Sequence, residues 1–166
     1  MTADGSPAVR SAGLVVRTAW VVHRALHRCS GGRIGLSRPI AGKRFGMMRL
    51  RTLGRRSGQS RVAIIGYYPD GQNLVGLAMN GWAEPDPAWW LNLQAQPDAT
   101  IDLPGRTVAV RARAAAGAER ERLWAGFAGY PGWGDDLGAL AARRSIERAV
   151  IVFEPRQLRT DTGVML

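Results

Sequence analysis

The sequence predicts a mainly β fold with some α, in which about six mostly antiparallel strands form a small closed barrel with short helices between them. Two observations support this prediction. From Met47 onward the apolar pattern changes to period two, which is typical of half-buried strands. Turn sequences at Asp70-Gly71 and Pro104-Gly105-Arg106 each separate two such segments, as in antiparallel hairpins. Closure of the sheet would remove the edges that an open sheet exposes.

Composition indicates an ordinary globular chain. Its 166 residues, 46% of them hydrophobic, are expected to form one main folded domain. The chain has no long uncharged apolar run and no secretion signal at its N-terminus, so we expect a cytoplasmic location. The single cysteine, Cys29, excludes an internal disulfide bond. His23 and His27 lie four residues apart without a carboxylate nearby, and we expect no metal site.

The positive charge is concentrated in the first third of the chain. Residues 1–61 contain 13 of the 23 Lys and Arg residues and one acid, Asp4, whereas the remainder has 10 basic and 12 acidic side chains. This distribution favours binding of anions such as phosphates, polycarboxylates, nucleic acid or an acidic membrane face.

The N-terminal part, residues 1–44, is predicted to contain a tail, an amphipathic helix and a basic glycine-rich link. In the helix, residues 9–28, arginines occupy one side and apolar residues the other. Two interpretations stay open: the helix packs its apolar face on the domain or a partner, or it lies on an anionic membrane surface. The barrel domain is assigned to residues 45–157 and a C-terminal tail to residues 158–166.

Strands are predicted where β-branched and aromatic residues gather between turn sequences, and helices where the apolar spacing lengthens. In residues 47–53, Met48, Leu50 and Thr52 alternate with arginines, so they should face the core. The last strand is apolar throughout and should be central. The predicted strands are residues 47–53, 61–69, 72–79, 99–103, 107–114 and 149–155, and the predicted short helices are residues 88–96, 119–127 and 135–144.

The arginine-rich turn between the first two strands, LGRRSGQSR at residues 53–61, has three interpretations: a solvated turn, a cradle for one anion, or a nucleic-acid patch. Gly54 and Gly58 could free backbone N–H groups to converge on an anion. RNA-binding sheets add stacking aromatic residues, but the adjacent Tyr67 and Tyr68 should face opposite sides of one strand. We therefore expect no nucleic-acid partner.

Two aromatic clusters could line a pocket. Trp89 and Trp90 begin the helix at residues 88–96, and only one of two adjacent tryptophans is expected to point fully inward. Tyr130 and Trp133 lie in a glycine-rich segment, where they could close over a planar ligand or fill a core. The barrel region lacks histidine, a cysteine nucleophile and a paired-carboxylate motif, so a reaction carried by a bound organic cofactor, such as hydride transfer, suits this chain best.

The ordered series GRRSGQSR, YYPDGQNLV, AMNGW, DPAWWLNLQAQPDATIDL, ERERLW, GYPGW and AVIVFEP resembles the deazaflavin-dependent nitroreductase family of actinobacteria. The resemblance covers about residues 45–156. It implies a split β-barrel that binds the 8-hydroxy-5-deazaflavin coenzyme F420. It also implies an oxidoreductase that passes hydride from the reduced coenzyme to a small organic acceptor, a quinone, enone or nitro compound.

Residues matching the family's motifs are expected to form the site. The cofactor-binding positions implied by the resemblance are Arg55, Arg56, Ser57, Arg61, Val62, Ala63, Ile64, Ile65, Gly66, Leu77, Ala78, Met79, Asn80, Ala88, Trp89, Trp90, Leu91, Asn92 and Trp133. The substrate-side positions are Trp82, Tyr130, Trp133 and Asp136, with Tyr130 as the candidate catalytic proton donor.

The chain departs from the family's pattern mainly on the substrate side. Met79 stands where a hydroxyl residue is common, Trp82 where a second glycine is common, and Trp133 and Asp136 where tyrosines are common. Two alternatives stay open: a non-catalytic deazaflavin or lipid carrier, and a split barrel that binds FMN. The expected partner is a small-molecule hydride acceptor. Peripheral membrane contact through residues 9–28 stays an open interpretation, and the chain is expected to be a monomer or a homodimer.

Overall fold

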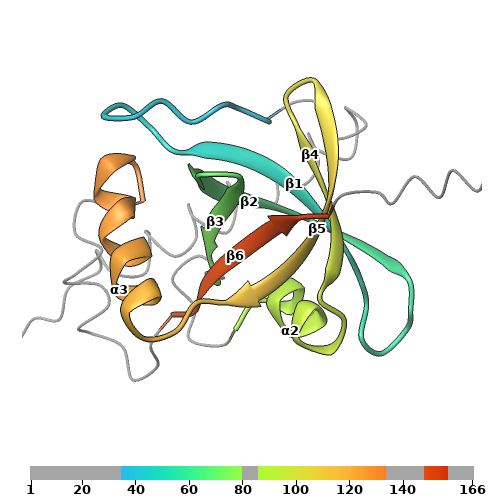
Figure 1. Cartoon of the computed structure of the whole chain (residues 1–166). Helices are drawn as coiled ribbons and strands as arrows, with labels where there is room; N and C mark the ends of the chain where they lie inside the picture. The colour runs from blue at the N-terminus through green and yellow to red at the C-terminus, as the bar shows by residue number, and fades with distance from the viewer. Residues whose placement is uncertain (1–34, 80–85, 134–147, 157–166) are drawn as a thin grey trace, which may run out of the picture. The chain divides into compact units, whose positions relative to one another are not determined.

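A computed structural model describes residues 35–79, 86–133 and 148–156, in which six strands close into an antiparallel barrel (Figure 1). By internal contacts the chain divides into Met1–Gly35 and Leu36–Leu166, and every element described below belongs to the second unit. The predicted helices at residues 9–28 and 135–144 lie outside the described residues.

The barrel strands follow the order β1-β2-β3-β6-β5-β4, and pairing of β1 with β4 closes the sheet. Their bounds are β1 Gly46–Leu53, β2 Ser60–Asp70, β3 Asn73–Leu77, β4 Asp98–Leu103, β5 Arg106–Ala114 and β6 Val150–Pro155. Every neighbouring pair is antiparallel. The predicted fold class is confirmed, and β3 ends two residues earlier than predicted.

The barrel interior is filled by alternate residues of each strand. In β1, Met48, Leu50 and Thr52 are all buried, as the alternation predicts. Met48 and Leu50 pack with Ile101 of β4 and Phe153 of β6 in one cluster. The Thr52 hydroxyl instead accepts a hydrogen bond from Asn92. Residues Val150 to Phe153 of β6 are buried throughout, because Ile151 and Phe153 pack in the interior while Val150 and Val152 pack in the outer cluster.

Two helices cover different parts of the barrel. Helix α2, Ala88–Ala95, places Trp89, Trp90 and Leu93 in the barrel core. Helix α3, Gly117–Gly126, and the short helix η1, Phe127–Gly129, pack Leu123 and Phe127 against the outer face of β2, β3 and β6. The barrel thus has an interior core and a second core on one outer face.

The two ends of the barrel differ in what they carry. The β1–β2 turn and α2 lie at one end, and the β2–β3 and β4–β5 turns lie at the other (Figure 1). Gly71 and Gly105, with φ of 61° and 82°, supply the left-handed conformation that these two tight turns require.

Candidate functional site

The arginine-rich turn is closed by its own backbone. Gly54 donates its N–H to the carbonyl of Gln59 at 2.8 Å, and its carbonyl accepts the N–H groups of Ser57 and Gly58 at 3.1 and 2.7 Å. Gly58 has a φ of 62°, and a Cβ on Gly54 would lie 3.0 Å from the Ser57 hydroxyl oxygen. The expectation of converging free N–H groups was wrong, because the tight turn uses these donors internally. Side chains therefore provide most of the donors for an anion at this turn.

A buried side-chain amide of α2, that of Asn92, is hydrogen-bonded to the arginine-rich turn. Asn92 accepts the backbone N–H of Arg55 with Oδ1 at 3.1 Å, and its Nδ2 donates to the hydroxyl of Thr52 at 3.2 Å. Asn92 and Thr52 are 5% and 3% exposed. The turn is thus fixed relative to α2 by hydrogen bonds shielded from water, which are stronger there than at the surface.

Three arginines stand on this turn and at the start of β2. Arg55, Arg56 and Arg61 are exposed, and Arg61 Nη2 lies 3.4 Å from the Ser57 hydroxyl oxygen. Within residues 35–79, 86–133 and 148–156, no carboxylate forms an ion pair with any of the three. Three forked donors without a protein counter-charge favour binding of phosphate or carboxylate groups.

From the turn, the outer face of β2 continues as an apolar strip. Val62, 54% exposed, is followed on the same face by Ile64 and then Gly66. At ~3.3 Å per residue, Val62 to Gly66 spans ~13 Å. An exposed valine beside unpaired arginines offers contact to the apolar part of an amphipathic anion.

Gly66 marks the point where aromatic side chains cover β2. A Cβ on Gly66 would lie 2.7 Å from the Trp133 ring and 3.0 Å from the Phe45 ring. These two rings pack with centroids 4.5 Å apart. The Trp133 indole N–H is buried and has no hydrogen-bond acceptor among the described residues. A glycine at this position allows both rings to lie directly on the strand.

Tyr130 packs on Tyr68, the next residue of β2 whose side chain faces outward. Its ring stacks on Tyr68 with centroids 5.2 Å apart, and Phe127 packs edge-on against Tyr68 at 4.9 Å. The Tyr68 hydroxyl donates to the carbonyl of Leu123 at 2.6 Å. Burial, followed by the charge of Asp70, raises the pKa of Tyr68 to about 12. Tyr68 is thus a neutral support beneath Tyr130 at physiological pH.

Comparison with known proteins shows the family of this chain. The profile of the F420H(2)-dependent quinone reductase family matches residues 20–135. The chain belongs to this family. An F420H(2)-dependent quinone reductase of Mycobacterium tuberculosis is 32% identical over 92 residues, 55% of this chain and 60% of the relative. A putative F420H(2)-dependent quinone reductase of the same species is 36% identical over 70 residues, 42% of this chain and 59% of the relative. The match thus spans about 60% of the length of these curated relatives.

Solved structures agree with the barrel fold of this quinone reductase family member. An F420-H2 dependent reductase, FDR-A, has a TM-score of 0.59 at 21% identity and covers 72% of this chain and 96% of its own. A structure described as a domain-swapped dimer has a TM-score of 0.60 at 21% identity and covers 83% of this chain and 99% of its own.

The sequence-predicted site residues of this family member divide between the two faces of the barrel wall. Leu77 and Met79 pack in the outer cluster together with Tyr130 and Trp133. The other group faces the barrel interior and comprises Ala63, Ile65, Ala78, Trp89 and Trp90. Ala88 is exposed and Leu91 half-buried on α2. Asn80, Trp82 and Asp136 lie outside the described residues.

The expectation that only one of Trp89 and Trp90 points inward was wrong. Trp89 is 8% and Trp90 6% exposed, and both belong to the interior cluster. Since α2 packs against β1, β2 and β5 at the end of the barrel, two adjacent positions of the helix both meet core. Both indoles therefore stabilise the barrel end on which the arginine turn rests.

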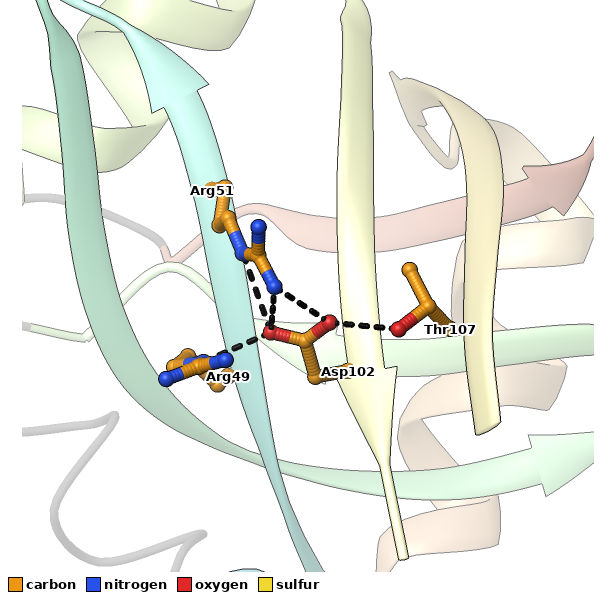
Figure 2. Close-up of polar contacts among 4 residues, drawn as sticks. All are labelled: Arg49, Arg51, Asp102 and Thr107. Atoms are coloured by element: carbon orange, nitrogen blue, oxygen red, sulfur yellow. Dashed lines mark hydrogen bonds and ion pairs between the residues drawn. The ribbon is translucent and has the colours of Figure 1, made fainter. Parts of the chain in front are cut away.

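Sequence reasoning missed an ion cluster beside the apolar strip. Figure 2 shows Asp102 of β4 between Arg49 and Arg51 of β1, with Thr107 on its other side. Asp102 Oδ2 lies 2.6 Å from Arg49 Nε and 2.7 Å from Arg51 Nη2, and Oδ1 accepts the Thr107 hydroxyl at 2.8 Å. Burial alone would raise the pKa of Asp102, but hydrogen bonds from Arg51, Thr107 and Arg49 outweigh it and lower the pKa. Because Arg49 and Arg51 pair with Ile64 and Val62 in register, this cluster borders the strip.

Two further residues of the site were also missed. Thr52 fixes Asn92, and a polar residue at an inward strand position is a sequence feature that points to a buried partner. Phe45 supports Trp133, and an aromatic residue directly before a glycine at a strand start is a weaker indication.

Proposed function

We propose that this chain binds the deazaflavin coenzyme F420 and transfers hydride from its reduced form to a quinone-type acceptor. The carrying observation is that three arginines, none of them paired with a described carboxylate, lie on the turn and at the start of β2, and that an exposed apolar strip and stacked aromatic rings follow along the outer face of this strand. Membership of the quinone reductase family supports the cofactor class and the reaction.

The residues present fit this coenzyme at both of its ends. Arg55, Arg56 and Arg61 would hold the phosphate and carboxylate groups of the tail, since no described carboxylate occupies them. Val62, Ile64 and Trp133 would contact the ring, and the buried indole N–H of Trp133 has no acceptor among the described residues. When bound, the reduced deazaflavin supplies the hydride.

The chain itself positions the reactants and excludes water. Trp133 forms the wall at Gly66, held by Phe45 and Phe127. Tyr130, fixed by its stack on Tyr68, is the proposed proton donor through its hydroxyl group. Positioning and dehydration of this kind supply much of the rate enhancement when a cofactor carries the chemistry.

The remaining predictions stay part of this proposal. The deazaflavin-binding domain would span residues 45–157, and Asn80, Trp82 and Asp136 would complete the ring and acceptor side. Among the described residues, no helix combines the length and apolarity needed to cross a bilayer. Contact of residues 9–28 with a membrane surface is tested by vesicle flotation with and without that segment.

The test is oxidation of reduced F420 by menadione, cyclohexenone and a nitroaromatic, followed by the fluorescence of the oxidised coenzyme. Acceleration with menadione supports the proposal. Tight coenzyme binding without acceleration by any acceptor would instead indicate a carrier. Parallel titrations with oxidised F420 and FMN check the cofactor, and tighter binding of FMN would overturn its assignment.

A further inference from the structure

A cavity lies at the opposite end of the barrel from the arginine turn. Its volume is about 480 Å³, which falls in the usual range for small-molecule sites. It lies where the segment before β1 meets the β2–β3 and β4–β5 ends of the strands. Its lining includes Arg38, Tyr67 and Arg106, together with three prolines and two leucines.

Tyr67 supplies a hydroxyl group to the wall of this cavity. The side chain is 4% exposed, and its hydroxyl makes no hydrogen bond to any described residue. A phenol hydroxyl at a cavity wall can donate a hydrogen bond to a bound ligand or accept one from it. The ring cannot readily turn away, since Gly46 packs on it so closely that a Cβ there would lie 2.5 Å from the ring. The phenol is thus held at the cavity wall, and its hydroxyl has no hydrogen-bond partner in the part of the chain that the structure describes.

Two arginines flank this phenol. Arg38 and Arg106 are both exposed, and in the described part of the chain neither forms an ion pair with a carboxylate. Burial raises the pKa of Tyr67, and the charges of Arg106 and Arg38 act in the opposite direction, so both charges reach the phenol. The polar side of the cavity therefore consists of donors with net positive charge.

The rest of the wall is apolar. Pro39, Pro69 and Pro104 are rigid and offer no N–H donor, and Leu74 and Leu103 extend the apolar surface into the barrel. An inorganic anion would leave this surface in contact with water. A ligand that satisfies both sides carries one anionic group and a compact apolar body.

We propose that this cavity binds a small organic anion, a carboxylate or phosphate monoester with an apolar body, through Arg38, Arg106 and the Tyr67 hydroxyl. This site is separate from the groove along β2 and does not rest on the proposed deazaflavin binding. Tyr67 and the residues of the groove lie on opposite faces of the same strand.

The test is a ¹H–¹⁵N NMR titration of the full chain with benzoate, phenyl phosphate, inorganic phosphate and benzyl alcohol. Benzoate or phenyl phosphate should shift the amides of residues 38 and 103–106 and leave those of residues 54–59 in place. Benzyl alcohol and inorganic phosphate should bind at least 10-fold more weakly. Equal binding of benzyl alcohol, or shifts confined to residues 54–59, would overturn the proposal.

Variants locate the donors. Arg38→Gln with Arg106→Gln should weaken benzoate binding at least 10-fold, and Tyr67→Phe, which keeps the ring, about threefold or more. Arg111→Gln on β5 is the matched control and should leave the affinity unchanged. Arg55→Ala with Arg56→Ala should also leave it unchanged, whatever that variant does to coenzyme binding. An unaltered benzoate affinity in the Arg38/Arg106 double variant, with a native spectrum, would refute the site.

Discussion

Asn92 of α2 accepts a hydrogen bond from the backbone N–H of Arg55, although 37 residues separate the two along the chain. This contact, together with a longer one of 3.5 Å from Arg55 Nη1 to the same oxygen, joins the helix that closes the barrel to the turn that carries the arginines. Asn92→Ala removes it and leaves the buried Thr52 hydroxyl without its partner. We expect the free energy of unfolding to fall by about 1–3 kcal/mol in a urea titration, and coenzyme affinity to fall because the turn loosens.

Thr52→Val is the matched control for this variant. It removes the Thr52 hydroxyl but keeps the Asn92 bond to Arg55, so it should lower stability and spare coenzyme affinity. An Asn92→Ala protein that binds F420 as tightly as the parent would show that the turn does not depend on this amide.

Arg55→Ala combined with Arg56→Ala should separate binding from stability. Both side chains are exposed, so stability should change by less than about 0.5 kcal/mol. Affinity for F420 should fall at least 100-fold, because each lost charged hydrogen bond is worth about 1.5–3 kcal/mol. Fluorescence titration measures this. The charge-matched control is Arg44→Ala with Arg122→Ala, and equal losses in the two double variants would indicate a general charge effect.

Gly66→Ala should displace Trp133. The new methyl group would lie 2.7 Å from the indole ring, and overpacking of this kind costs about 1–3 kcal/mol. We expect a changed tryptophan fluorescence spectrum and a higher KM for the acceptor. Gly129→Ala, where no atom lies within 4 Å of the added Cβ, is the control and should behave like the parent. The idea fails if both variants have the same fluorescence and KM.

Asp102→Asn should make stability less dependent on acid pH. The pKa of Asp102 is lowered from 3.8 in the folded state, so its contribution is present above that value and is lost as pH falls through the folded pKa. At pH 7 we expect a loss of about 2–3 kcal/mol relative to the parent. Urea titrations at pH 7 and at pH values below ~3.8 should show this difference shrinking in acid. A constant difference would mean that the cluster does not depend on the ionised carboxylate.

Tyr68→Phe should reveal the opposite dependence at alkaline pH. The folded-state pKa of about 12 exceeds the ordinary value of 10.0, so the contribution is complete below pH 10.0 and is lost as pH rises toward 12. The variant should lose about 1–2 kcal/mol at pH 8, because the Leu123 carbonyl loses its donor. In urea titrations the parent's advantage should shrink by pH 11, and an advantage that grows there would contradict the shift.

Much of the barrel could be predicted because its determinants are local. The alternation in residues 47–53 predicts which side chains of β1 face inward, and glycine turns predict the hairpins after Asp70 and Leu103. The family resemblance supplied the cofactor class. These inferences need only neighbouring residues or an ordered series of motifs.

Other features could not be predicted, because they depend on closure of the barrel. Trp89 and Trp90 are both buried only because α2 meets several strands at the barrel end. Asp102 finds Arg49 and Arg51 through the β1–β4 pairing that closes the sheet, more than 50 residues away along the chain. The cavity beside Tyr67 likewise forms only when three separate segments meet around it.

Because Tyr67 faces the interior and Tyr68 faces the outer cluster, the fold depends on the number of residues in β2. Deleting one residue within the strand would exchange its two faces beyond that point. Side chains that now pack in the interior would then face the outer cluster, and those of the outer cluster would face the interior. A change of length is better tolerated in the turn between Gly54 and Gln59, ahead of the strand, than within the strand itself. Differences in loop length among related chains should therefore occur mainly at that turn, where they change the reach of the arginines but leave the two faces of β2 unchanged.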